Sequence, residues 1–339
     1  MSSGGKESAS TMNLDRAMVV KGRPKIYHVV LTIIKISAGL ALLVLSLREF
    51  QLDSLWFGIR SANLAWLCLA VVSVLVGLAL KLWRWLILIK NYHIHASFSR
   101  LFSAFFTGQA ANILLPLRGG ELIRLGYFME EKKILPEAAS TILLEKYLDL
   151  LALSVAILIV TFRISVEHLP DIQGWLIPLT IALTVLLFSV IIFGPSILSL
   201  VKESKFLPNS IAPWLEHWVQ ASLWLRHPMQ VLPGVLLTCL IWGVMWLTNL
   251  LLFKSLGIAL GGTAGGLVLV LVYVGLLPAL MPGNIGPFYF FASLALVPFG
   301  IIHGQALVYA MLLHAIVTLP PLLGGAIGLF MHTPRPHSL

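Results

Sequence analysis

Three charged residues interrupt an apolar stretch of the chain. Glu145, Lys146 and Asp149 lie within STILLEKYLDLLALSVAILIV, residues 140–160. Positions i and i+4 share one face of a helix, so Glu145 and Asp149 are expected to point the same way. Ionisable side chains in such a helix are rare and usually face a cavity or a partner. We predict a buried functional pair; the alternative is that both carboxylates snorkel to an interface.

A second charged group follows a predicted break in the backbone. Segment 101–117, LFSAFFTGQAANILLPL, contains Pro116 and is followed by Gly119 and Gly120, and a helix is expected to break at these three residues. Broken backbone at membrane depth leaves N–H and C=O groups unpaired, so it survives only where it is buried in protein or lines a wet cavity. The charged residues that follow are Arg118, Glu121 and Arg124.

These arginines have two interpretations. An arginine is a planar fork suited to phosphate or carboxylate, so Arg118 and Arg124 are candidate headgroup ligands and counter-charges for Glu145 and Asp149. A solvated, basic cytoplasmic loop is the alternative. Gln109 and Asn112, three positions apart, would share a helical face beside the break, although polar residues there also serve simply to hold helices together.

A second break is predicted near residue 282. Proline removes a backbone donor and clashes with the preceding helical turn, so this stretch cannot be a straight helix. Its helix-breaking residues are Pro278, Pro282, Gly283, Gly286 and Pro287. Pro116 with Gly120 and Pro282 with Gly286 share the spacing P-x-x-x-G, which indicates a pseudo-repeat with a central site. His314, in the span that follows, is either a satisfied core histidine or a proton relay or headgroup ligand.

The composition indicates that the helices carrying these residues lie in lipid rather than in water. Of 339 residues, 58% are hydrophobic and 11% are charged, and the mean hydropathy is +0.94. A soluble domain carries about 25% charged residues. The net charge of +9 therefore indicates cytoplasmic loops near anionic lipid headgroups rather than nucleic acid. Two cysteines support neither a disulfide framework nor a Cys-based metal site, and no metal or cofactor is expected.

Apolar length predicts an all-α fold. A helix needs about 20 apolar residues to cross the bilayer. The predicted spans are 26–47, 63–80, 141–162, 175–200, 229–253, 264–281 and 305–330, with interrupted segments at 101–117 and 282–300. The predicted fold is a polytopic membrane helical bundle of about 7–8 spans, with two broken or re-entrant helices in a pseudo-repeat. Gly324 and Gly328 form a small-xxx-small face for close helix packing.

The domain organisation follows from the same pattern. Residues 1–25 are predicted to be a disordered cytosolic tail, and residues 26–330 a single transmembrane domain. Its halves, about 26–200 and 229–330, are joined by an interfacial linker at 201–228. Alternating loop charges place the N-terminus in the cytoplasm and the chain in the cell (inner or plasma) membrane. Trp83 and Trp85, beside Arg84, are interpreted as an interfacial anchor. Topology beyond Phe253 stays open because residues 255–334 contain no Asp, Glu, Lys or Arg.

Residues 112–153 resemble a known signature. The stretch NILLPLRGGELIRLGYFMEEKKILPEAASTILLEKYLDLLAL is similar to the first signature of the flippase-like family named for the transmembrane region of lysylphosphatidylglycerol synthase. The stretch LLPALMPGNIGPFYF resembles the second signature. The matching positions in the first are Asn112, Pro116, Gly119, Gly120, Glu121, Arg124, Glu145, Lys146 and Asp149. The chain departs from the family pattern at three positions: Tyr289 stands for Glu, His314 for Arg and Lys146 for Arg.

The resemblance implies a broken-helix membrane protein that moves or handles polar lipids, without a fused transferase domain. The leading hypothesis is translocation of a phospholipid or polyprenyl-phosphate through a central cavity. Arg118, Arg124 and Lys146 would attract phosphate, and the carboxylates would hold them or couple to protons. Two alternatives stay open: a membrane-embedded lipid-modifying transferase or phosphatase, and an accessory subunit of a separately encoded lipid or glycan synthase. The expected partners are membrane lipids, and no nucleic acid.

Overall fold

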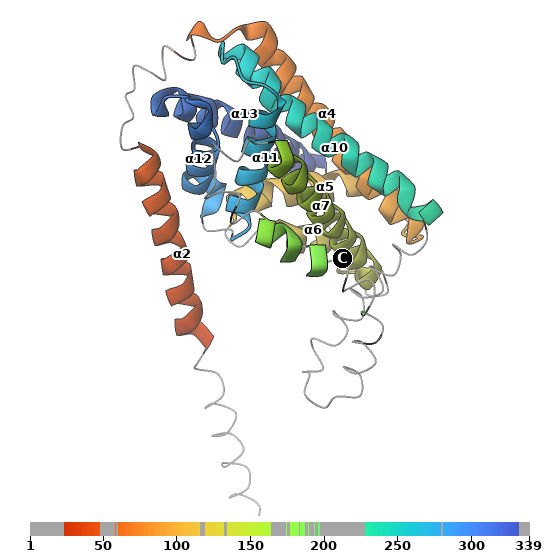
Figure 1. The fold of residues 1–339 in the computed structure, drawn as a ribbon. Coiled ribbons are helices and arrows are strands. Elements are labelled where there is room, and N and C mark those ends of the chain that lie inside the picture. The colour runs from red at the N-terminus through yellow and green to blue at the C-terminus, as the bar shows by residue number, and fades with distance from the viewer. Residues whose placement is uncertain are drawn as a thin grey trace, which may run out of the picture.

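The computed structural model is built of helices (Figure 1). It describes residues 24–47, 58, 60–115, 119–131, 134–163, 228–278 and 281–331, with scattered positions between 174 and 196. Every regular element in these ranges is helical, which confirms the predicted all-α class. Residues 1–23 of the predicted tail, most of span 175–200 and residues 201–227 of the linker lie outside the described residues, as do Pro116 and Arg118.

The helices fall into two series along the chain. The first comprises α2 (Pro24–Leu47), α4 (Leu64–Asn91), α5 (Phe98–Leu114), α6 (Gly120–Gly126) and α7 (Leu135–Arg163). The second comprises α10 (Pro228–Ser255), α11 (Gly262–Leu276), η4 (Pro282–Asn284), α12 (Ile285–Leu294), η5 (Val297–Phe299) and α13 (His303–Met331). Both predicted breaks are therefore present: α5 ends before Pro116, and η4 separates α11 from α12.

Three of the described helices are long and apolar enough to cross a membrane. They are α4, residues Val231–Ser255 of α10, and α13. The other long helix, α7, has 29 residues, and Glu145, Lys146 and Asp149 interrupt its apolar sequence. Two shorter helices are also apolar: residues Ile34–Leu47 of α2, and α11. A membrane-embedded bundle accounts for the large apolar side chains on the outside, such as Phe162 and Phe330.

The second predicted span was too short, and the interfacial anchor was wrong in part. Helix α4 continues to Asn91, so residues 81–91 are helix and not a loop. Arg84 is 2% exposed and Trp85 is fully buried, whereas Trp83 is 56% exposed. Arg84 and Trp85 face the interior because they have hydrogen-bond partners there. The Arg84 guanidinium donates to Asp149, and the Trp85 indole N–H donates to the Thr141 hydroxyl. Only Trp83 is placed as an outward-facing anchor would be.

The two series match in length and in packing. Helices α4 and α10 have 28 residues each, and α7 and α13 have 29 each. Figure 1 shows α4 and α10 side by side, and they pack along each other; α5 packs along α13, and α7 along α11. This exchange of partners is what two repeats related by a two-fold rotation produce.

Small residues let α13 approach α5 closely. A Cβ atom added to Gly324 would lie 2.3 Å from the Phe106 ring, and one added to Gly328 would lie 3.1 Å from the Ser103 Cα atom. The predicted close-packing face at Gly324 and Gly328 is therefore confirmed, and its partner is α5. This contact fixes the helix before the first break against the last helix of the second series.

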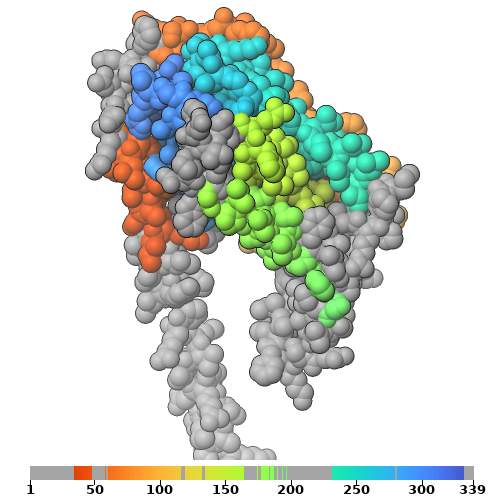
Figure 2. Space-filling view, viewed as in Figure 1, coloured from red at the N-terminus to blue at the C-terminus, as the bar shows by residue number. Residues whose placement is uncertain are grey.

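The second break depends on two unusual backbone conformations and one close approach. Gly283 has φ +71° and Asn284 has φ +54°, values that suit glycine and, among other residues, asparagine. Helix α12 then packs on α2, which Figure 2 shows in red against the blue C-terminal part. A Cβ atom on Gly286 would lie 2.2 Å from the Gly39 carbonyl oxygen and 2.9 Å from the Leu43 backbone nitrogen.

The substitution Gly286→Ala should therefore destabilise the protein. Backbone atoms of α2 cannot swing aside as a side chain can, so we expect a cost of about 1–3 kcal/mol in the free energy of unfolding. The matched control is Gly243→Ala on α10, where an added Cβ meets nothing within 4 Å. Denaturation of both variants in detergent micelles would measure the difference. Equal stability of Gly286→Ala and Gly243→Ala would contradict the close packing of α12 on α2.

Candidate functional site

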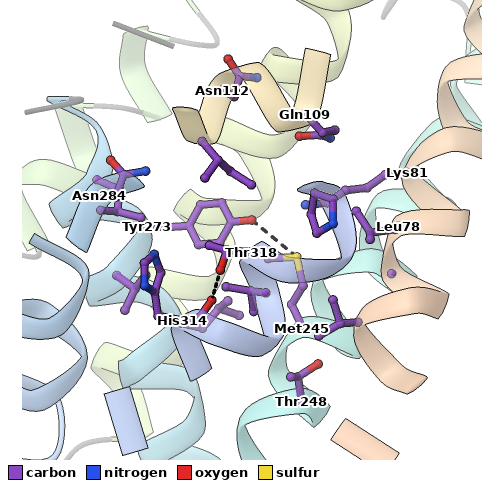
Figure 3. Close-up of a pocket in the computed structure, with 18 of the residues that line it drawn as sticks. Leu78, Lys81, Gln109, Asn112, Met245, Thr248, Tyr273, Asn284, His314 and Thr318 are labelled. Atoms are coloured by element: carbon purple, nitrogen blue, oxygen red, sulfur yellow. Dashed lines mark hydrogen bonds between the residues drawn. The ribbon is translucent and has the colours of Figure 1, made fainter. Parts of the chain in front are cut away.

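A cavity of about 330 Å³ lies at the centre of the bundle (Figure 3). Its walls come from α4, α5, α6, α7, α10, α11, η4, α12 and α13. Both broken segments therefore contribute to one space, as the predicted pseudo-repeat requires. The volume falls in the range of small-molecule sites, about 300–1,000 Å³.

Arg84 of α4 anchors the charged wall of this cavity. Its Nη1 atom lies 2.8 Å from Asp149 Oδ1, and its Nη2 atom lies 3.1 Å from Asp149 Oδ2. Nη1 also donates to the Thr238 hydroxyl at 2.8 Å, and Nη2 lies 3.8 Å from Glu145 Oε1. This two-pronged pairing is the strong geometry of arginine with a carboxylate. The predicted burial of Glu145 is explained, because α4 and α6 neutralise it.

Arg124 of α6 is the second counter-charge. Its Nη1 atom lies 2.7 Å from Glu145 Oε2, which confirms the predicted pairing of Arg124 with the α7 carboxylates. The guanidinium carbon lies 3.6 Å from the centre of the Trp85 ring, a cation–π contact. Its Nε and Nη2 atoms are buried without a hydrogen-bond partner. Arg124 thus lines the cavity with donor capacity to spare.

Asn112 joins the two sides of the first break. Its side-chain oxygen accepts a hydrogen bond from the Gly120 backbone N–H at 2.9 Å, and its amide nitrogen donates to Glu121 Oε1 at 3.1 Å. Lys146 of α7 pairs with the same Glu121 oxygen at 2.6 Å. Burial alone would raise the pKa of the Glu121 carboxyl; Lys146 and Asn112 outweigh that effect and hold its pKa below the ordinary value. Asn112 therefore ties the end of α5 to the start of α6, and Glu121 with Lys146 links α6 to α7.

His314 of α13 performs the corresponding task at the second break. Its Nε2 atom lies 2.9 Å from the Gly283 carbonyl oxygen, and its Nδ1 atom lies 3.4 Å from the Tyr289 hydroxyl. A neutral imidazole that donates from Nε2 and accepts at Nδ1 satisfies both contacts. Gly283 and Asn284 line the cavity, whereas Tyr289 touches it only through His314. Two of the three positions that depart from the family signature, His314 and Tyr289, therefore meet in space.

The model of one protein family, described as the lysylphosphatidylglycerol synthase TM region, matches residues 30–325. The chain belongs to this family. Members are membrane proteins of lipid metabolism or translocation, and this chain is a membrane-embedded protein of that kind. No curated protein matches the chain.

Most of the predicted site residues of this family member meet at the cavity. Those that line it are Gln109, Asn112, Arg124, Glu145, Lys146, Asp149 and His314. Glu121 contributes through Asn112 and Lys146. Of the helix-breaking residues, Gly119, Gly120, Pro278, Pro282, Gly286 and Pro287 flank the two breaks, and Gly283 lines the cavity.

The sequence interpretation missed several polar lining residues. They are Ser73, Lys81, Arg84, Thr248, Asn249, Tyr273, Asn284 and Thr318. A signal for part of this set exists in α4, where the small or polar Ser73, Gly77, Lys81 and Arg84 recur every three or four positions along an apolar helix. That spacing marks one helical face. In the ranges that the structure describes, no three His, Cys, Asp or Glu side chains gather in a metal-binding cluster.

Proposed function

We propose that this family member moves a polar or anionic lipid across the membrane, with the headgroup passing through the central cavity. The lipid is of phospholipid or polyprenyl-phosphate type. The observation that carries the proposal is that two broken helices and a cluster of ion pairs line one cavity inside a bundle of apolar helices. A lipid-facing bundle has no structural need for three buried or partly buried cations, Lys81, Arg84 and Arg124, around one space, because charge within the bilayer is costly.

The arrangement suits a polar cargo with apolar chains. The charged wall offers Lys81, Arg84, Arg124 and Lys146, which are donors for phosphate oxygens. Apolar side chains such as Leu269 and Leu313 line other parts of the same cavity. The carboxylates of Glu145 and Asp149 keep the arginines in place between transport events.

The test is transbilayer movement of a fluorescent phospholipid in proteoliposomes. The double variant Arg124→Ala with Glu145→Gln removes both partners of one ion pair, so it leaves neither charge buried and unpaired. We expect lipid movement to fall to the rate of protein-free vesicles. Glu131→Gln is the matched control, because Glu131 pairs with Arg100 outside the cavity. Movement at the wild-type rate in the folded double variant would refute this site.

A further inference from the structure

The charges around the cavity do not cancel. The described cations are Lys81, Arg84, Arg124 and Lys146, and the described carboxylates are Glu121, Glu145 and Asp149. Three ion pairs account for all the carboxylates: Arg84 with Asp149 at 2.8 Å, Arg124 with Glu145 at 2.7 Å, and Lys146 with Glu121 at 2.6 Å. Among these residues, Lys81 has no ion-pair partner. The inventory therefore leaves one surplus positive charge.

The opposite wall adds no charge. Figure 3 shows Lys81 on the α4 side, with Asn284 and His314 across the cavity. Residues 255–334 include no Asp, Glu, Lys or Arg, so α11, η4, α12 and α13 supply only neutral groups. The contacts of His314 with Gly283 and Tyr289 suit a neutral ring. This wall offers the hydroxyl and amide groups of Tyr273, Asn284 and Thr318, and α10 adds those of Thr248 and Asn249.

Arg124 also carries a positive charge beside the cavity, and two of its donors have no hydrogen-bond partner. Its side chain is 9% exposed, and its Nε and Nη2 donors lack a partner. Buried donors without partners are costly. A negative charge in the cavity would stabilise this guanidinium through space, whereas an ammonium group would repel it. Both carboxylates that line the described cavity are already paired with arginines, so neither is left free to pair with an amine.

We propose that the cavity selects lipids with a single negative charge: a phosphodiester joined to an uncharged, hydroxyl-bearing headgroup, with Lys81 neutralising the phosphate. This inference rests on the proposed function and narrows its cargo. One phosphodiester cancels the one surplus charge, and the neutral wall hydrogen-bonds the polyol or sugar. A headgroup with an added amine brings a cation that finds no partner. A phosphomonoester brings a second negative charge that finds none either.

The energetic cost of a charge without a partner sets how strongly the cavity should prefer one lipid over another. A lysine near the protein surface interacts with an opposite charge by several kcal/mol at about 4 Å, and desolvation offsets much of that energy. A net difference of about 1.4 kcal/mol corresponds to tenfold in affinity. We therefore expect about a tenfold preference for phosphatidylglycerol over phosphatidylethanolamine.

The experiment compares labelled phosphatidylglycerol, phosphatidylethanolamine and phosphatidic acid in proteoliposomes. The wild-type protein should move phosphatidylglycerol fastest. Lys81→Met should lower its rate toward that of phosphatidylethanolamine and abolish the preference. Lys90→Met is the matched control, because Lys90 lies on the same helix, is exposed and does not line the cavity; it should keep the preference. Glycerophosphoglycerol, which is the same phosphodiester headgroup without acyl chains, is added as a competitor to separate a lipid site from a general phosphodiester site.

The outcomes separate this inference from the proposed function. If the wild-type protein moves none of the three lipids, the proposed function fails. If it moves all three equally, or prefers phosphatidylethanolamine, the function stands and the charge inference is overturned. If Lys81→Met keeps the wild-type preference, Lys81 is not the deciding residue and the inference is also overturned. Glycerophosphoglycerol at millimolar concentration should leave lipid movement unchanged; if it stops lipid movement, the site recognises the free phosphodiester and the inference that it selects lipids is overturned.

Discussion

Replacing Arg84 by methionine should remove about 3–5 kcal/mol from the free energy of unfolding. The change keeps an unbranched apolar stem and removes the guanidinium. Asp149 then loses both of its arginine hydrogen bonds, and Glu145 loses one of its two neighbouring cations. Breaking a buried pair from one side is costly because a charge is left without a partner in a low-dielectric interior. Denaturant titration in detergent micelles would measure the loss.

Asp149, the carboxylate partner of Arg84, supplies the internal control. Asp149→Asn in the Arg84→Met background removes the orphaned charge, so the double variant should be more stable than Arg84→Met alone. Arg84→Lys should fall between wild type and Arg84→Met, because an ammonium keeps the charge but not the two-pronged geometry. If Arg84→Met matches the wild-type stability, the carboxylates of α7 do not depend on α4, and the charged wall has been assigned wrongly.

Arg84 also shows where prediction from sequence stops. Local signals predicted the all-α fold and both breaks, because proline and glycine act within a few residues. Sequence also offered Arg118 and Arg124 as candidate counter-charges for the α7 carboxylates, and the structure pairs Arg124 with Glu145. Arg84 and Asp149 are 65 positions apart. An apolar-length rule ended the predicted span at residue 80 because Lys81 and Arg84 lower the local hydropathy. Nothing near them in sequence indicates that a carboxylate on another helix would compensate their burial.

The pairing of Lys146 and the polar residues of the neutral wall could not be predicted from sequence for the same reason. Lys146 was predicted to attract phosphate directly, and the structure shows it paired with Glu121; its role in binding a headgroup stays a prediction. Asn249 and Tyr309 form a buried hydrogen bond of 2.6 Å across 60 positions. Isolated polar residues in apolar helices indicate helix contacts in general, but they do not reveal which of them surround a common cavity. That information comes only from how α4, α10 and α13 pack.

The largest effect of a single methyl group is expected at Gly120. A Cβ atom at this position would lie 1.9 Å from the Gly108 carbonyl oxygen and 2.6 Å from the Asn112 side-chain carbon. The first of these is a backbone atom within α5, so α6 must move away to accommodate Gly120→Ala. Movement breaks the hydrogen bond from the Gly120 N–H to Asn112 and draws Arg124 away from Glu145. We expect a loss of about 3 kcal/mol or more in stability, from overpacking and lost polar contacts together.

The neighbouring glycine makes the comparison decisive. Gly119 has φ −67°, which any residue adopts, and an added Cβ would meet Leu115 at an ordinary 3.5 Å. Gly119→Ala should therefore change the stability by less than about 1 kcal/mol. It should also leave lipid movement intact, whereas Gly120→Ala should abolish it because the displaced Arg124 no longer completes the charged wall. Both variants are compared by denaturation in micelles and by lipid movement in proteoliposomes. Equal behaviour of the two alanine variants would mean that the Gly-Gly pair acts only as a flexible linker and that α6 is not held against α5 by close backbone contact.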